Sequence, residues 1–151
     1  MSLDARALFA ALSSHAQTLG IFDAVNEHEP MNRPGSGMTC AFWFVRLGPL
    51  PPGSGLSATT GLAVFTARIY KPQQQPSGAE DTDLMGAADR LMAAYSADFT
   101  LGGLVRNVDL LGQSGLQLSA QAGWLQQDPA PLRTVDITIP LICNDLWPQQ
   151  P

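Results

Sequence analysis

Apolar and polar residues alternate most clearly in one stretch of the chain, Ser57–Tyr70, which reads SATTGLAVFTARIY. The stretch is rich in β-branched and aromatic residues and contains no proline, so it predicts a long strand. Successive strand side chains point to opposite faces of a sheet, and here both sets contain apolar residues. We therefore expect a central strand whose two faces are both at least partly covered, by helices or by a neighbouring subunit.

Two segments show the three- and four-residue spacing of apolar residues that is typical of helices. The first predicts a helix from about Leu3 to Thr18, with Ser2 as its N-cap, Asp4 in its first turn and Gly20 at its end. The second predicts a helix that is capped by Asp81 or Thr82 and ends near Ala97. Its expected apolar face consists of Leu84, Met85, Ala88, Leu91, Met92 and Tyr95.

Five further segments predict strands: Ile21–Asn26, Thr39–Leu47, Leu104–Leu111, Leu116–Gln126 and Arg133–Cys143. The second of them, TCAFWFVRL, is continuously apolar and should be well buried, with a break at Gly48–Pro49. The fourth should turn Ala120, Ala122 and Trp124 inward. Pro140 cannot donate to a ladder, so the last strand should be an edge, or leave the sheet there.

The order of these elements predicts the fold class. The last three strands follow one another after short turns, which favours an antiparallel meander. We expect an α+β fold: a mostly antiparallel sheet with a long central strand, two helices flanking one face, and a C-terminal three-strand meander. Residues 1–151 are expected to form a single domain, since the segment that follows the polar stretch after Tyr70 is too short to form a separate core.

Charge is scarce in this chain, and this affects both its partners and its surface. Only 14% of residues are charged, below the roughly 25% usual for soluble domains, which favours burial between subunits. The 13 acidic and 8 basic side chains give a net charge of −5, without the clustered Lys and Arg that nucleic-acid binding requires. No apolar run is long enough for a membrane span, and the beginning of the sequence lacks signal-peptide architecture, so synthesis in the cytosol is expected.

Residues that could support catalysis or bind metal are few. His28 between two glutamates has no second histidine at a helical spacing, and a solvated acidic loop is the simpler interpretation. Cys40 and Cys143 lie in apolar runs, where a thiol packs as a small hydrophobe. Asp109 and Asp136 could pair as acid and base, but strand carboxylates more often face solvent. Two Gly-Ser-Gly sequences lack the Lys-Ser/Thr of a phosphate loop. We expect no cofactor, no metal and no enzymatic activity.

Several longer segments resemble tail terminator proteins of long, non-contractile-tailed bacteriophages, of the actinobacteriophage and prophage type. The resemblance covers nearly the whole chain in order. It is carried by FDAVNEHEP (22–30), GSGLSATTGLAVFTARIY (53–70), ADRLMAAYSADFTLGG (88–103), VDLLG (108–112), QAGWLQQD (121–128) and RTVDITIPLICNDLW (133–147). It rests on structural segments and not on a catalytic signature.

The resemblance implies a structural protein of the virion tail and neck, assembled in the host cytoplasm. Six copies would form a ring that caps the tail tube, stops its growth and joins it to the head–tail connector protein. The partners would be other copies of the chain, the tube protein and the connector, with genomic DNA passing through an acidic lumen without specific binding. Contacts are expected from three Gly/Pro-rich loops, through Arg33, Gly35, Gly37, Pro49, Pro51, Gly53, Gly55, Lys71 and Gln73.

Two other functions stay open on the sequence alone. One is a neighbouring role in the virion, as another head–tail joining protein or as a tail-tube protein. The other is a small hydrolase or metal-dependent enzyme that uses His28 and the acids beside it. The number of copies per particle would separate the first from a terminator. Activity that survives His28→Ala substitution and metal removal would eliminate the second.

Overall fold

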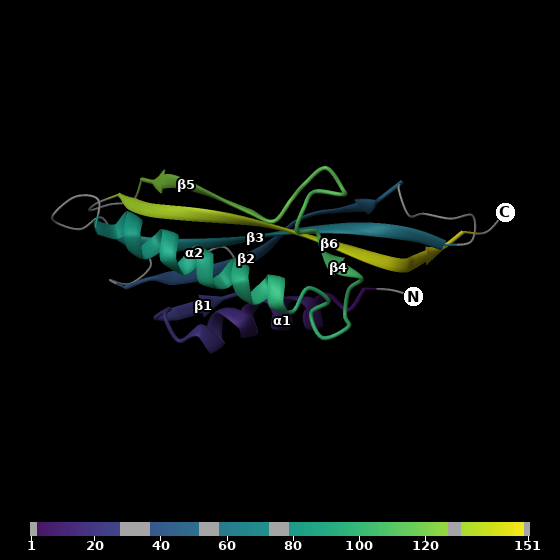
Figure 1. Cartoon of the computed structure of the whole chain (residues 1–151), viewed down its shortest axis with the longest axis horizontal. Coiled ribbons are helices and arrows are strands. Elements are labelled where there is room, and N and C mark those ends of the chain that lie inside the picture. Colours follow the sequence, from purple (N-terminus) through teal and green to yellow (C-terminus); the bar gives the residue numbers. More distant parts are fainter. Residues whose placement is uncertain (1–2, 28–36, 52–57, 73–78, 127–130, 150–151) are drawn as a thin grey trace.

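The predicted long strand lies in the middle of a mixed six-stranded sheet (Figure 1). This computed structural model describes residues 3–27, 37–51, 58–72, 79–126 and 131–149. The elements are α1 (Ala5–Leu19), β1 (Ala24–Asn26), β2 (Thr39–Pro49), β3 (Ala58–Pro72), α2 (Ala79–Ala97), β4 (Asn107–Val108), β5 (Ser119–Leu125) and β6 (Leu132–Pro148). The strand order is β1-β2-β3-β6-β4, and β5 also pairs with β6. Every pairing is antiparallel except that of β1 with β2.

Both helices lie on the same face of the sheet, so the predicted α+β class is confirmed (Figure 1). Along β3, alternate residues from Ala63 to Ile69 point toward the helices, and they pack with buried residues of β2 and β6 in one large apolar core. Leu8, Leu12 and Ala16 of α1 reach this core, as do Leu84, Leu91 and Tyr95 of α2. Burial of this apolar surface is the main force that holds the helices on the sheet.

The opposite face of the sheet is covered in two places by side chains of the chain itself. One small cluster contains Leu50, Leu62, Val64 and Ile142, and the other contains Ala41, Tyr70 and Leu132. Between them, Arg68 donates from Nε and Nη2 to the two carboxylate oxygens of Asp136, at 2.6 and 2.9 Å. This ion pair lies across directly opposed positions of β3 and β6. Asp136 therefore has a structural partner, and both faces of β3 are covered as the sequence predicted.

The ends of α1 show one confirmed prediction and one correction. Gly20 adopts a left-handed conformation with φ +68° and ends the helix, as predicted. Asp4, and not Ser2, is the N-cap, because its carboxylate accepts a hydrogen bond from the backbone amide of Ala7 at 3.1 Å. The helix therefore begins at Ala5, two residues later than predicted.

The prediction that Pro140 marks an edge strand is wrong, because β6 is paired on both sides. Pro140 lies opposite Val64 of β3, and its carbonyl accepts from the amide of Asp109 on the other side. In an antiparallel ladder the amide and carbonyl of a residue point to the same side. The side of Pro140 that lacks an N–H therefore points toward β4 and β5, at the place where the one strand ends and the other begins. Because this side points away from β3, the pairing with β3 loses no hydrogen bond.

The predicted strand Leu104–Leu111 is almost entirely wrong, and only Asn107 and Val108 join the sheet, as β4. Residues 99–106 form consecutive turns instead, with positive φ at Leu101, Gly102 and Gly103. The alternating apolar pattern was produced by single side chains such as Val105, which packs into the core from a turn. The C-terminal meander is present, with β4 and β5 each pairing to β6.

Three predicted apolar faces are less buried than expected. β2 is buried only over its first four residues, and from Phe44 onward it is largely exposed. On β5, the supposedly inward Ala120, Ala122 and Trp124 are exposed. On α2, Met85 is 77% exposed and Ala87 takes its place in the core. Exposed apolar patches of this kind are uncommon on proteins that act alone.

Gly61 in the middle of β3 has a packing reason. A Cβ built there would lie 2.4 Å from Cδ1 of Leu146, which is itself buried against the core. We expect Gly61→Ala to lower the free energy of unfolding by about 1–3 kcal/mol through overpacking. The measurement is urea unfolding. In a Leu146→Ala background the added methyl should cost much less, and an equal cost in both backgrounds would contradict this explanation.

Candidate functional site

The predicted contact residues fall at two opposite ends of the sheet. Arg33, Gly35, Gly53, Gly55 and Gln73 lie outside the described residues, as does His28. The others are described: Gly37, Pro49, Pro51 and Lys71. Gly37 and Lys71 lie at one end, because the start of β2 pairs with the end of β3, whereas Pro49 and Pro51 lie at the other end. The structure does not bring the four together in one place.

Two of these four residues have a role within the chain. The Lys71 ammonium donates to the carboxylate of Asp83 and so ties the end of β3 to the first turns of α2. Arg133 of β6 makes a parallel link, since its Nε donates to Asp81 at 2.8 Å. A Cβ at Gly37 would lie 1.8 Å from an oxygen of Asp23, so only glycine fits beside that carboxylate. Contacts of these residues with another molecule stay a prediction.

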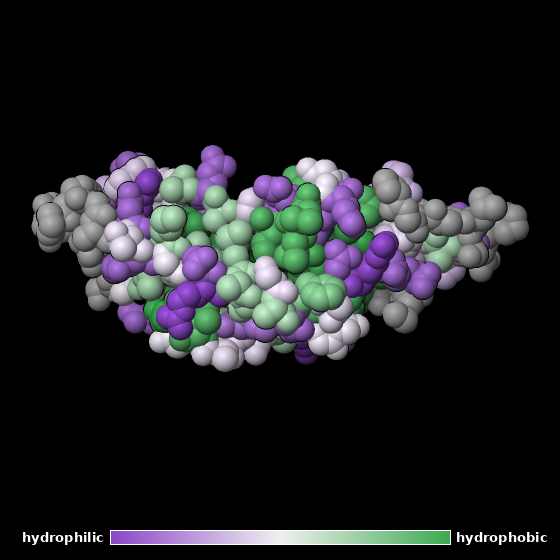
Figure 2. All heavy atoms as spheres, viewed as in Figure 1, coloured by the Kyte–Doolittle hydropathy of each residue, from purple (hydrophilic) through white to green (hydrophobic). Residues whose placement is uncertain are grey.

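One exposed apolar area lies along β5 and α2, and we call it the front patch. We define it as Met85, Ala120, Ala122 and Trp124, around a groove of about 280 Å³ whose floor includes Leu84 and Val135. Trp124 follows Ala122 on the same face of β5 and stacks on the guanidinium of Arg133 at 4.7 Å. In Figure 2 the surface over α2 and β5 mixes pale green and hydrophilic residues, and the most hydrophobic block on this side lies near the end of α2 and β4.

A second apolar area lies at the other edge of the sheet, and we call it the back patch. We define it as Phe9, Phe44, Val45 and Leu47, where α1 and the second half of β2 leave a groove of about 290 Å³ between them. Every residue that lines this groove is apolar, and its floor is Phe65 of the central strand. Phe44 is 51% exposed, although its ring makes an edge contact with that of Phe65. Sequence reasoning missed both patches because it assigned their residues to the core.

A rigid loop connects β4 to β5 beside the front patch. Asp109, which is only 1% exposed, accepts hydrogen bonds from the backbone amides of Gly112 and Gln113 on Oδ1 and of Ser114 on Oδ2. Burial raises the pKa of Asp109, but the hydrogen bonds from Ser114, Gln113 and Gly112 outweigh it, so the pKa is lowered. The expectation that this carboxylate faces solvent is wrong, and its role is to shape the loop.

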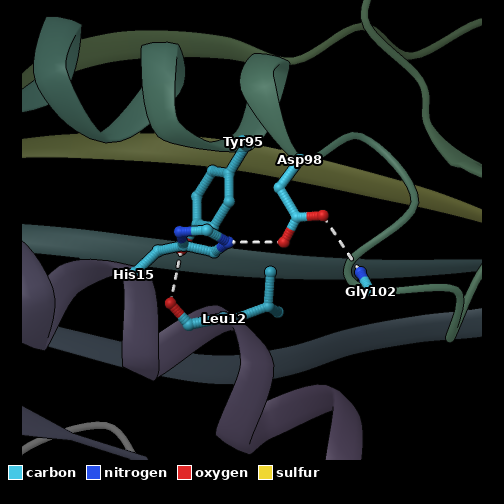
Figure 3. Close-up of polar contacts among 5 residues, drawn as sticks. All are labelled: Leu12, His15, Tyr95, Asp98 and Gly102. Carbon is cyan, nitrogen blue, oxygen red and sulfur yellow. Dashed lines mark hydrogen bonds and ion pairs between the residues drawn. The ribbon is translucent and has the colours of Figure 1, made fainter.

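The two helices are joined by a polar contact between α1 and the end of α2 (Figure 3). His15 Nε2 lies 2.9 Å from Oδ2 of Asp98, and the ring of His15 stands edge-on to that of Tyr95. The buried Tyr95 hydroxyl donates to the carbonyl of Leu12, and Asp98 also accepts from the amide of Gly102. The hydrogen bonds from His15 and Gly102 lower the pKa of Asp98. No substrate-sized cavity opens on these residues in the described part, so the contact fastens the helices together.

The described residues provide little for catalysis. Cys40 and Cys143 are buried free thiols, and burial raises the pKa of both, that of Cys143 to about 11, so neither is an activated nucleophile. Among the described residues no group of three or more His, Cys, Asp and Glu side chains could hold a metal ion. Neither described helix is long and apolar enough to cross a membrane. The features from which a function can be argued are the exposed apolar areas, and the two patches lie at opposite edges of the sheet.

Comparison with known proteins finds similarity to solved structures alone. No protein-family model and no curated protein matches the sequence. Among solved structures, a chain described as "Virion of native gene transfer agent (GTA) particle" is similar to this chain, with 14% sequence identity and a TM-score of 0.35. The similarity covers 94% of this chain and 88% of that chain. At this TM-score it carries no argument about function.

The carboxylate of Asp109 provides a test of the rigid loop. Asp109→Asn should lower the free energy of unfolding by about 1–3 kcal/mol, because the amide group would present a donor to the N–H of Ser114. The pKa of Asp109 is lower in the folded state than in the unfolded state. The stabilisation by its charged carboxylate is therefore fully present above the unfolded pKa of about 3.9 and is lost as the pH falls through the folded pKa. Urea unfolding from pH 7 to pH 3 should therefore show a difference between wild type and variant that shrinks with acid. A difference that stays constant over this range would contradict the role of the charge.

Proposed function

We propose that the protein is a structural component of a phage-like virion, and specifically a tail terminator that assembles into a ring on the end of the tail tube. The observation that carries the proposal is the pair of exposed apolar patches at opposite edges of one sheet. Two different surfaces on one subunit allow head-to-tail contacts, and head-to-tail contacts close into rings when the rotation between copies permits. The sequence resemblance to tail terminators supports the same function.

In this proposal the protein works by covering surfaces and not by catalysis. One side of the ring would bind and cover the exposed growing end of the tube, and the other would present a surface to which further tube subunits cannot bind. Growth would stop there, and the connector would bind instead. Six copies of a chain with net charge −5 would give the lumen an acidic character, so DNA could pass without being held.

The four described contact residues fit this arrangement. Gly37 and Lys71 at one end of the sheet, and Pro49 and Pro51 at the other, would face the two partners on either side of a ring whose copies meet through the sheet edges. A tail-tube protein is the second candidate function, because it would use the same kind of ring in many stacked copies. The two differ in what the purified protein does on its own.

The test is native mass spectrometry of the purified full chain, followed by electron microscopy after mixing with the tube protein of the same particle. We expect a discrete ring, of six copies, that binds tube ends and stops their elongation. Spontaneous stacking into long tubes would favour the tube protein instead. A strict monomer at high concentration that leaves tube growth unchanged would overturn both.

A further inference from the structure

The two apolar patches lie at opposite edges of the same sheet. The front patch is built on β5, which pairs only with β6 among the described strands, so its outer edge offers unpaired backbone groups. The back patch is built on β2 beyond Ala41, after the last residue that pairs with β1. An unprotected apolar strand edge is a template for pairing with another strand. Each edge therefore offers unpaired backbone groups beside apolar side chains, and the other edge could pair with both.

The strand directions fit a second copy as that partner. Along the path β2-β3-β6-β5 each neighbouring pair is antiparallel. Placing β2 of another copy beside β5 continues this alternation, since β2 and β5 run in opposite directions. β5 lies level with the end of β3 near Ile69, whereas the free half of β2 lies level with its start near Gly61. A sheet that closes on itself has tilted strands and a staggered register, so a stagger between the two edges is compatible with a closed ring.

We infer that the front patch of one copy seats on the back patch of the next, with the outer edges of β5 and β2 paired. The contact is heterologous, so each copy uses both patches, one toward each neighbour. This inference rests on the proposed function because it supplies the contact that closes the ring. It assigns the ring contact to residues 44–47 and 120–124, away from the Gly/Pro-rich loops.

The test uses two variants that each block one patch. Leu47→Glu places a charge in the back patch, and Ala122→Glu places one in the front patch without removing a contact inside the subunit. Burying an unpaired carboxylate at an apolar contact is unfavourable, so each variant alone should form rings at least about tenfold less readily than wild type. Mixed together, they should form a one-to-one dimer, because each still carries the patch that the other lacks.

The mixing result also shows that both variants fold, because a misfolded chain would not pair. The matched controls are Leu104→Glu, at a leucine with 44% exposure against 43% for Leu47, and Ala10→Glu, at an exposed alanine on the far side of α1. Both controls should assemble like wild type. The readout is native mass spectrometry of each variant and of the mixture.

The failures of the inference and of the proposed function are distinguishable. If wild type forms rings and both blocking variants do so equally well, the assigned contact is wrong, whereas the proposal that the protein forms a ring still holds. Dimers formed by either variant alone would show a self-complementary contact and overturn the head-to-tail arrangement. If wild type forms no ring at any concentration, the proposed function itself fails.

Discussion

The pairing of β3 with β6 is the constraint on which the rest of the structure depends. Their register runs from Ala58 opposite Pro148 to Pro72 opposite Leu132, so the two long strands form one ribbon. The helices pack on one face of this ribbon, and Arg68 and Asp136 pair on the other. Two helices are enough to cover the middle of this ribbon. They leave a groove beside β5 and another beside the second half of β2, and apolar residues of both strands stay exposed there.

This incomplete cover links the composition to the proposed assembly. A chain with few charged residues has little polar surface with which to shield the edges of a long sheet. Natural sheets protect such edges with charges, prolines or covering segments. Here β5 carries two Ala, one Gln and one Trp at its exposed positions, and the free half of β2 carries Phe, Val and Leu with one Arg and, at its end, Pro49. Contacts with identical copies would provide the cover that one chain lacks.

The sequence predicted the elements whose pattern is set locally. Helical spacing identified both helices, and Gly20 ended the first because only a left-handed residue fits there. The alternation in SATTGLAVFTARIY identified the central strand. Predictions failed where contacts between distant parts of the chain determine the structure. Pro140 is tolerated inside the sheet because the side that lacks an amide points away from β3. Asp109 is buried because three backbone amides donate to its carboxylate. The site was missed for the same reason, since no local pattern distinguishes an apolar residue in a core from one at an interface.

The central claim is that the edges of β2 and β5 are uncovered in one chain and covered by neighbouring copies. Hydrogen exchange of the wild-type protein, measured by mass spectrometry at low and high concentration, tests it most directly. The account predicts that amides in residues 43–49 and 119–125 exchange more slowly at high concentration, while those in β3, already bonded on both sides, do not change. Equal exchange of the two edge segments at every concentration would contradict it.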